Sequence, residues 1–206
     1  MTLRTSPLRA LLFLASVLFL FSGSLHAKNF RTVVIDAGHG GKDKGGSYGK
    51  IYEKHLALDT SLRLARYLKQ RGIRVKMTRS SDYFIPLTQR AAIGNSISNS
   101  IFVSVHYNYT WKRHVSGLET FYYSSKSRAL ASYVQDRCVR KTRCNSRGVK
   151  FGRFAVLRRS QNPAILVECG FVSNSYERNR MKTAKYRQAM AEGIGEGIIK
   201  YKKSRY

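Results

Sequence analysis

The stretch "VVIDAGHGGKDKGG", residues 33–46, decides the class of fold that we expect. Thr32–Asp36 forms an apolar run of the length and composition of a buried strand. His39 follows directly after this strand, with a glycine on either side. Glycines allow the backbone to turn sharply and let other groups come close to it. The stretch therefore predicts a strand that ends in a functional loop.

Strands and helices alternate along the rest of the chain. The predicted strands are Thr32–Asp36, 73–78, Ile101–His106, 118–123, 154–158 ("FAVLR") and 164–169 ("AILVEC"). The predicted helices are Glu53–Arg71, 87–98, Ser127–Lys141 and Tyr186–Tyr201. This alternation is typical of an α/β protein. We expect a single central, mostly parallel sheet of about six strands with helices on both faces.

The N-terminus is predicted to lie outside this fold. Arg4 and Arg9 flank the start of an apolar run, Ala10–Phe21, and small residues follow it. This order is typical of a secretory signal peptide, and the run is shorter than the ~20 residues that span a bilayer. We therefore favour export over a retained membrane anchor. Cleavage is expected after Ala27, so that residues 1–27 are removed, with a cut after Ser24 as the alternative.

The chain is strongly basic, with 38 Lys and Arg residues against 11 Asp and Glu residues and a net charge of +27. Residues 1–27 carry only two of these charges, both positive, so that the mature protein keeps +25. Such a field attracts polyanions. For an exported protein these are wall polymers rich in carboxylates and anionic lipid head groups, and we expect no nucleic-acid partner. A merely solubilising surface is the alternative, although the excess is larger than solubility requires.

Three cysteines cannot all pair within one chain. Cys138 and Cys144 are close enough in sequence to form a disulfide in an oxidising compartment, provided that the helix between them ends. Cys169 lies in a predicted strand and is expected to be a small buried hydrophobic residue. The chain has no Cys-x-x-Cys motif, so a zinc site made of thiolates is not expected.

Polar side chains follow several predicted strands at their carboxyl ends. His39 follows the first strand, His106 ends the third, Glu168 lies at the end of "ILVE", and Glu53 opens the first helix. Open α/β sheets bind ligands beyond the carboxyl ends of their strands. If these strands are parallel, the four groups converge on one edge of one sheet.

Two imidazoles and one carboxylate are a set that suits a catalytic zinc ion with one position open for water. Zinc lowers the pKa of its water toward ~7 and polarises a carbonyl group. A nearby carboxylate must then move the proton, and Glu168 is the candidate general base and acid. Asp36 is a candidate to orient the His39 ring.

Each residue also has a structural interpretation when it is taken alone. A histidine at a strand end commonly makes a structural hydrogen bond, and a glutamate in a first helical turn interacts well with the helix dipole, as Glu53 would. Glu168 is harder to explain in this way, because a carboxylate after three apolar residues is costly to bury without a partner. We do not expect His55 or His114 to be metal ligands.

Segments distributed along the chain resemble one enzyme family in their order and content. They are "VVIDAGHGGKDKGG", "YEKHLALD", Thr78–Arg79, Leu87–Arg90, "IFVSVHYN", "RGVKFGRFAVLR" and "PAILVECGFVSN". In this order they are similar to the segments of zinc-dependent N-acetylmuramoyl-L-alanine amidases, from Arg31 to Tyr201.

The resemblance implies both an activity and a set of site residues. It implies that His39, Glu53 and His106 bind zinc and that Glu168 is the catalytic carboxylate. The implied reaction is cleavage of the amide that joins the lactyl group of muramic acid to L-alanine in peptidoglycan. We therefore expect residues 28–206 to be a single catalytic zinc amidase domain on an α/β fold. We expect a periplasmic monomer that acts on peptidoglycan or muropeptides and is not stably inserted in a membrane after signal cleavage.

The chain departs from the family after the second histidine, where it reads Tyr107-Asn108-Tyr109 followed by Thr110-Trp111. These rings are expected either to line a groove in which a sugar stacks or to pack on their own strand. Some family members have an inserted helix that blocks the zinc. Between Ser124 and Arg147 there is room for one ordinary helix only, so we expect no such plug.

Two other functions fit part of the pattern. A zinc peptidase or carboxypeptidase acting on the stem peptide would need the same metal site. The "SYGK" stretch at Ser47–Lys50 has the spacing of serine acyl-enzymes, which is weak evidence for such an activity. The other alternative is a non-catalytic exported basic protein that binds wall polymer or nucleic acid.

Overall fold

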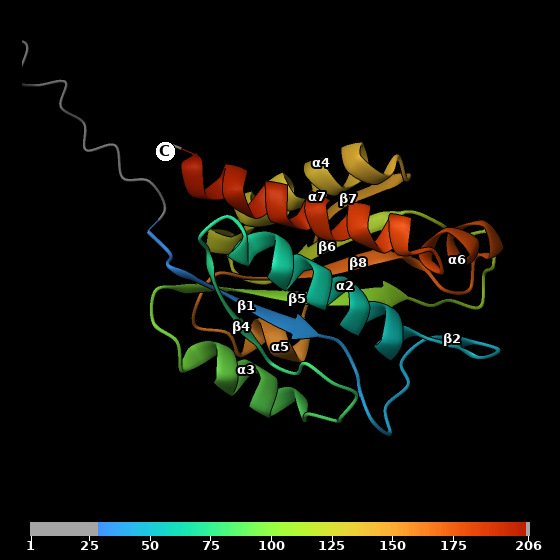
Figure 1. Cartoon of the computed structure of the whole chain (residues 1–206), viewed down its shortest axis with the longest axis horizontal. Helices are drawn as coiled ribbons and strands as arrows, with labels where there is room; N and C mark the ends of the chain where they lie inside the picture. Colours follow the sequence, from blue (N-terminus) through green and yellow to red (C-terminus); the bar gives the residue numbers. More distant parts are fainter. Residues whose placement is uncertain (1–28, 205–206) are drawn as a thin grey trace, which may run out of the picture.

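The computed structural model describes residues 29–204 (Figure 1), so the predicted signal peptide at residues 1–27 lies outside the described part. The strands of the main sheet are β1 (Thr32–Ala37), β4 (Arg74–Met77), β5 (Ser100–Asn108), β6 (Leu118–Tyr122), β7 (Ser146–Phe151) and β8 (Ala164–Phe171). They form one six-stranded sheet in the order β4-β1-β5-β8-β6-β7. Neighbours are parallel except at the antiparallel pair β8–β6. The predicted mostly parallel sheet is confirmed.

Helices cover both faces of this sheet, as the sequence predicts. The helices are α2 (Glu53–Lys69), α3 (Leu87–Asn95), η1 (Ser125–Ser127), α4 (Arg128–Thr142), α5 (Ala155–Arg158), α6 (Ser175–Met181) and α7 (Ala184–Lys203). Figure 1 shows α2, α4 and α7 on one face and α3 and α5 on the other. A two-stranded hairpin, β2 (Ser47–Tyr48) and β3 (Ile51–Tyr52), precedes α2.

The larger part of the core lies under α2, α4 and α7. Leu64, Val134 and Ile194, one from each helix, are fully buried there against the sheet. Helices α4 and α7 pack so closely that a Cβ atom added at Gly197 would lie 2.5 Å from the Cα of Val134. A small residue is therefore required at this crossing. A second, smaller apolar cluster fills the opposite face of the sheet, under α3 and α5.

The predicted strand at 154–158 is wrong, because this segment forms the short helix α5. Val156 and Leu157 are both buried in the smaller cluster, whereas consecutive residues of a strand point to opposite faces. The actual strand is β7, just before it in the chain. β7 lies at the edge of the sheet and is half exposed, so its apolar signal is weak. The hairpin and α6 are further elements that the sequence analysis missed.

All three cysteines are buried free thiols. α4 ends at Thr142, between Cys138 and Cys144, as a disulfide would require. The Cys144 sulfur instead accepts a hydrogen bond from the Thr142 hydroxyl at 3.0 Å. Among residues 29–204, no helix has the length and apolar character needed to cross a membrane.

Candidate active site

His39 lies in a glycine loop that begins where β1 ends. Its backbone adopts the left-handed conformation, with φ at 58°. Two buried arginines hold the loop through its carbonyl groups. Arg90 donates to the carbonyl oxygens of Ala37 and His39, at 2.6 and 2.5 Å, and Arg79 donates to that of Gly38 at 2.6 Å. The strained loop is therefore fixed from beneath by two guanidinium groups, which present several donors in a rigid plane.

The expectation that Asp36 orients His39 is wrong. Both carboxylate oxygens of Asp36 accept hydrogen bonds from other side chains, namely those of Thr78, Arg90 and Ser104. The orienting group is Asp43, whose Oδ2 lies 2.8 Å from His39 Nδ1. Asp43 is in the same glycine loop, four residues on, and its proximity in sequence was the signal that could have identified it.

Glu53, at the start of α2, lies between the two histidines. Its Oε2 is 3.1 Å from His39 Nε2, and its Oε1 is 2.8 Å from His106 Nδ1. One ligand atom from each of the three residues lies within 4.8 Å of the other two. The backbone N–H groups of Gly46 and Tyr107 also donate to this carboxylate, at 2.7 and 3.0 Å. The structure therefore brings together the three residues that the sequence singles out as metal ligands.

The charges of this cluster support one another. Burial works against the charged form of Glu53, but its contacts with His106 and His39 hold the pKa of the carboxyl far below its ordinary value. Burial likewise lowers the pKa of His39, but hydrogen bonds and attraction to Glu53 and Asp43 outweigh it and raise that pKa overall. The carboxylates therefore favour positive charge at this edge of the sheet.

Glu168, on β8, is buried beside the cluster. It pairs in register with His106 on β5 and with Glu119 on β6. Its Oε2 atom is buried and has no hydrogen-bond partner among the described residues. Burial, together with the negative charges of Glu53 and Glu119, raises the pKa of the Glu168 carboxyl well above its ordinary value. A buried carboxyl with a raised pKa in a cluster of this kind is typical of an acid–base group.

Glu119 is a buried site residue that the sequence analysis missed. Its Oε1 accepts a hydrogen bond from Asn108 at 2.9 Å. Its Oε2 accepts from Arg147 and Lys150, at 2.9 and 2.5 Å. The signal that could have identified it is a glutamate in the predicted strand "LETFYY", where a carboxylate needs a buried partner.

An apolar cavity of about 330 Å³ adjoins the histidines on the side of the sheet covered by α3 and α5. His39 and His106 are among the residues that line it. The apolar lining comes from Phe84, Ile85, Leu87, Phe154, Val156 and Leu166. A cavity with apolar walls and a few convergent polar groups is typical of a ligand site.

The aromatic residues after His106 divide into two kinds. Tyr107 is fully buried, and its hydroxyl lies 2.7 Å from that of Thr60, so it belongs to the core. Tyr109 and Trp111 are 40% and 88% exposed, with ring centroids 5.9 Å apart. A Cβ atom on Gly46 would lie 2.8 Å from the Cβ of Tyr109, so that Tyr109 borders the loop around Glu53.

His55 and His114, which we did not expect to bind metal, are not part of the His39–Glu53–His106 cluster. His55 is half exposed, with Nε2 3.5 Å from Asp82 Oδ2. His114 is exposed on the surface. Ser47 and Lys50 are exposed on the β2–β3 hairpin. Helix α4, the one helix between Ser124 and Arg147 apart from η1, packs on α7.

Comparison with known proteins identifies relatives over most of the chain. A family model described as N-acetylmuramoyl-L-alanine amidase matches residues 33–200. The uncharacterized protein YqiI of Bacillus subtilis is 37% identical over 175 residues, which cover 83% of this chain and 84% of that protein. The probable cell wall amidase LytH of Staphylococcus aureus is 32% identical over 174 residues. That match covers 83% of this chain but only 58% of LytH.

Solved structures show the same fold. The catalytic domain of CwlV, an N-acetylmuramoyl-L-alanine amidase from Bacillus (Paenibacillus) polymyxa, matches with a TM-score of 0.80 and 36% identity. This match covers 84% of our chain and 98% of that domain. An N-acetylmuramoyl-L-alanine amidase from Clostridium difficile matches with a TM-score of 0.80, 39% identity, and coverage of 84% and 97%. Those two chains consist almost entirely of the matched region.

Proposed function

The chain belongs to the N-acetylmuramoyl-L-alanine amidase family and is an enzyme, and we propose that it cleaves an amide bond of peptidoglycan with a zinc ion as Lewis acid and Glu168 as the proton-transfer group. The bond is the amide between the lactyl group of N-acetylmuramic acid and L-alanine. The observation that carries this proposal is the His39–Glu53–His106 cluster beside a buried, unpartnered carboxyl group.

The three clustered residues fit a catalytic zinc site. Two imidazole nitrogens and a carboxylate, all within 4.8 Å of one another, are a common set of three protein ligands for catalytic zinc. Asp43 and the Gly46 and Tyr107 amides hold His39 and Glu53 in place, as partners of metal ligands do. A zinc ion held by these ligands would supply Lewis-acid chemistry to the amide carbonyl and to the attacking water.

Glu168 performs the proton transfers in this proposal. It takes a proton from the attacking water as the new C–O bond forms at the lactyl carbonyl carbon. It then gives this proton to the nitrogen of L-alanine as the C–N bond breaks, which leaves a lactyl carboxylate and a stem peptide with a free amine. The raised pKa of the Glu168 carboxyl fits a group that must hold a proton between these steps.

Substrate contacts are proposed from the surroundings of the cluster. The apolar cavity is suited to methyl groups of the lactyl–alanyl unit, and Tyr109 and Trp111 offer faces on which a sugar can stack. The mature charge of +25 concentrates anionic stem peptides near the protein. We further propose that the chain is exported by residues 1–27 and acts as a monomer in the periplasm.

The decisive experiment incubates purified residues 28–206 with defined muropeptides and identifies the products by mass. It is run with zinc, with a chelator, and with the Glu168→Ala variant. Release of an intact stem peptide that begins with L-alanine, lost in both controls, would support the proposal. Loss of terminal stem residues alone would indicate a carboxypeptidase. Retention on the polymer without cleavage under any condition would indicate a basic wall-binding protein.

A further inference from the structure

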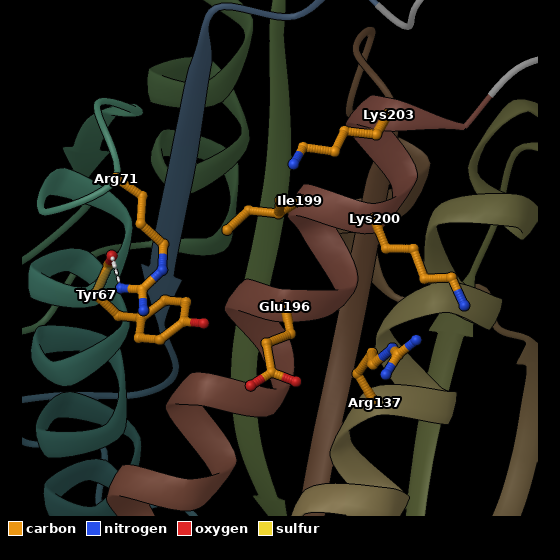
Figure 2. A pocket seen from close by; sticks show the side chains of 7 residues that line it. All are labelled: Tyr67, Arg71, Arg137, Glu196, Ile199, Lys200 and Lys203. Atoms are coloured by element: carbon orange, nitrogen blue, oxygen red, sulfur yellow. Dashed lines mark hydrogen bonds between the residues drawn. The ribbon is translucent and has the colours of Figure 1, made fainter.

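A basic depression of about 620 Å³ lies on the face of the protein formed by α2, α4 and α7, far from the candidate active site. Figure 2 shows that α7 forms its middle, while Tyr67 and Arg71 border it from the α2 side and Arg137 from α4. Lys200 and Lys203 border it from the last turn of α7. Three helices thus bring cations that are distant in sequence to one place.

The charges of this depression are only partly neutralised. Arg71 lies over the ring of Tyr67, 3.6 Å from its centroid, and donates to the Tyr67 carbonyl oxygen at 3.1 Å. Arg71, Lys200 and Lys203 are all exposed to solvent. Glu196 is the one acidic residue among those that line it, and its carboxylate already accepts a hydrogen bond from Lys141 at 2.9 Å. A ligand with negative charge would therefore be attracted here.

The depression and the candidate active site lie at opposite ends of α2. Glu53 opens this helix of 17 residues, and Arg71 follows its last turn. A helix of this length is about 25 Å long. A surface bound at the Arg71 end would therefore leave the site around Glu53 facing away from it.

The described chain also begins at this end of the molecule. The Phe30 ring stacks on that of Tyr201 with a centroid distance of 6.2 Å, and the Lys202 amine donates to the Phe30 carbonyl oxygen. The apolar run Ala10–Phe21 precedes Phe30 by only eight residues. If residues 1–27 export the chain as proposed above, this run lies in the membrane until it is cleaved, and eight residues reach at most about 28 Å, so that the depression is then within reach of the lipid surface.

From these observations we propose that the basic depression binds the phosphate groups of anionic phospholipids and docks the protein on the membrane surface with its active-site edge turned outward. The partner is a lipid surface because the cations lie in an open depression near Phe30, at the end of the fold to which the export segment is joined until it is cleaved. Tyr67, with a ring that is half-buried beside Arg71, suits the boundary between head groups and water. This proposal does not depend on the catalytic roles argued above.

The test uses residues 28–206, which lack the apolar run, and measures flotation with vesicles of phosphatidylcholine with or without phosphatidylglycerol. The variant Lys200→Glu/Lys203→Glu is compared with Lys182→Glu/Lys185→Glu, which makes the same change of charge near the other end of α7 at exposed positions. We expect binding only to the anionic vesicles. We expect at least about 25-fold weaker binding of the first variant and little change in the second, because each basic side chain near an anionic surface contributes about fivefold.

Three results would overturn the proposal. Equal losses in the two variants would show that net charge alone attracts the protein. Displacement from vesicles by inorganic phosphate, but not by potassium chloride of equal ionic strength, would show a site for soluble anions. If Lys200→Glu/Lys203→Glu lost binding to purified peptidoglycan while its binding to vesicles stayed unchanged, the depression would be assigned to wall polymer. Cleavage of a soluble muropeptide by Lys200→Glu/Lys203→Glu at the wild-type rate would show that the variant is folded, and its amide hydrolysis is assayed separately from docking.

Discussion

Glu168 lies directly opposite His106 where β8 and β5 pair in parallel. Residues opposite each other on neighbouring strands point to the same face of a sheet, with the strands about 4.8 Å apart. This register brings a buried carboxyl group with a raised pKa beside two imidazoles that contact one carboxylate, that of Glu53. Two proposed roles, cation binding at His106 and proton transfer at Glu168, thus lie on adjacent strands, and they can be tested separately.

Replacing Glu53 and replacing Glu168 should have different effects. Glu53→Gln should weaken zinc binding by more than the roughly 10–100-fold typical for loss of an outer partner, because Glu53 is a direct ligand in the proposed site. Glu168→Gln should bind zinc like the wild type but lower kcat by about 10²–10⁴-fold, the usual contribution of a general acid–base group. Competition with a chelating dye measures the first effect, and turnover of a muropeptide measures the second. Equal zinc affinities of the two variants would refute this division of roles.

Zinc should also stabilise the protein against heat. A ligand that binds only the folded state adds about 2.7 kcal/mol at 100 times its Kd. We therefore expect the Tm of residues 28–206 to rise when zinc is added and to fall again with a chelator. His39→Ala should remove most of this rise. A zinc-dependent rise of the same size in His39→Ala would place the ion at another site.

Gly45 is predicted to be essential for the site because of the space it leaves. Its φ is +66°, and an added Cβ atom would lie 2.6 Å from Glu53 Oε2 and 2.6 Å from His39 Cδ2. Gly49 has a similar φ of +58°, but nothing lies within 4 Å of its would-be Cβ atom. Both Gly→Ala variants carry the same backbone strain, of about 1 kcal/mol. Only Gly45→Ala should lose zinc affinity and turnover, and a comparable loss in Gly49→Ala would attribute the effect to strain instead.

Arg90 is predicted to stabilise the loop of His39 through a buried ion pair. Its Nη1 lies 2.9 Å from Asp36 Oδ1, and both side chains are almost completely buried. Removing one partner of such a pair typically costs about 3–5 kcal/mol. Chemical denaturation should show this loss for Arg90→Met. The control Arg63→Met, which breaks a half-exposed pair with Asp59, should cost less than about 1 kcal/mol.

The link between α2 and α7 should depend on pH. Burial raises the pKa of Asp59, but hydrogen bonds from Arg63 and Arg187 outweigh it, so that this pKa lies below its ordinary value of 3.8. A carboxyl with a depressed pKa in the folded state stabilises the protein above its unfolded pKa, and this contribution is lost as the pH falls through the folded value.

Asp59→Asn should therefore lower the free energy of unfolding by roughly 0.5–1 kcal/mol at pH 7, a figure that allows for the partial exposure of the pair. The difference from the wild type should shrink below pH 3.8. Urea denaturation at several pH values measures it. A difference that stays constant down to pH 3 would show that the ion pairs are not its origin.

Much of the site could be predicted from the sequence because its residues follow the ends of strongly apolar strands. The runs before His39, His106 and Glu168 identify the strands without ambiguity. The parallel order of β1, β5 and β8 then brings their carboxyl ends together. Asp43 and Glu119 were missed because an isolated carboxylate in a loop or strand does not reveal its partner.

The sequence by itself determined most of the strands and helices, the α/β class of the fold and the edge at which the polar groups meet. These features depend on the burial pattern within each element, which the sequence records directly. The tertiary structure alone decided that Asp43 rather than Asp36 contacts His39, that β6 runs antiparallel to β8, and that α2, α4 and α7 share a basic depression. Such contacts join residues from different elements, so they depend on strand register and helix packing, which no local pattern specifies.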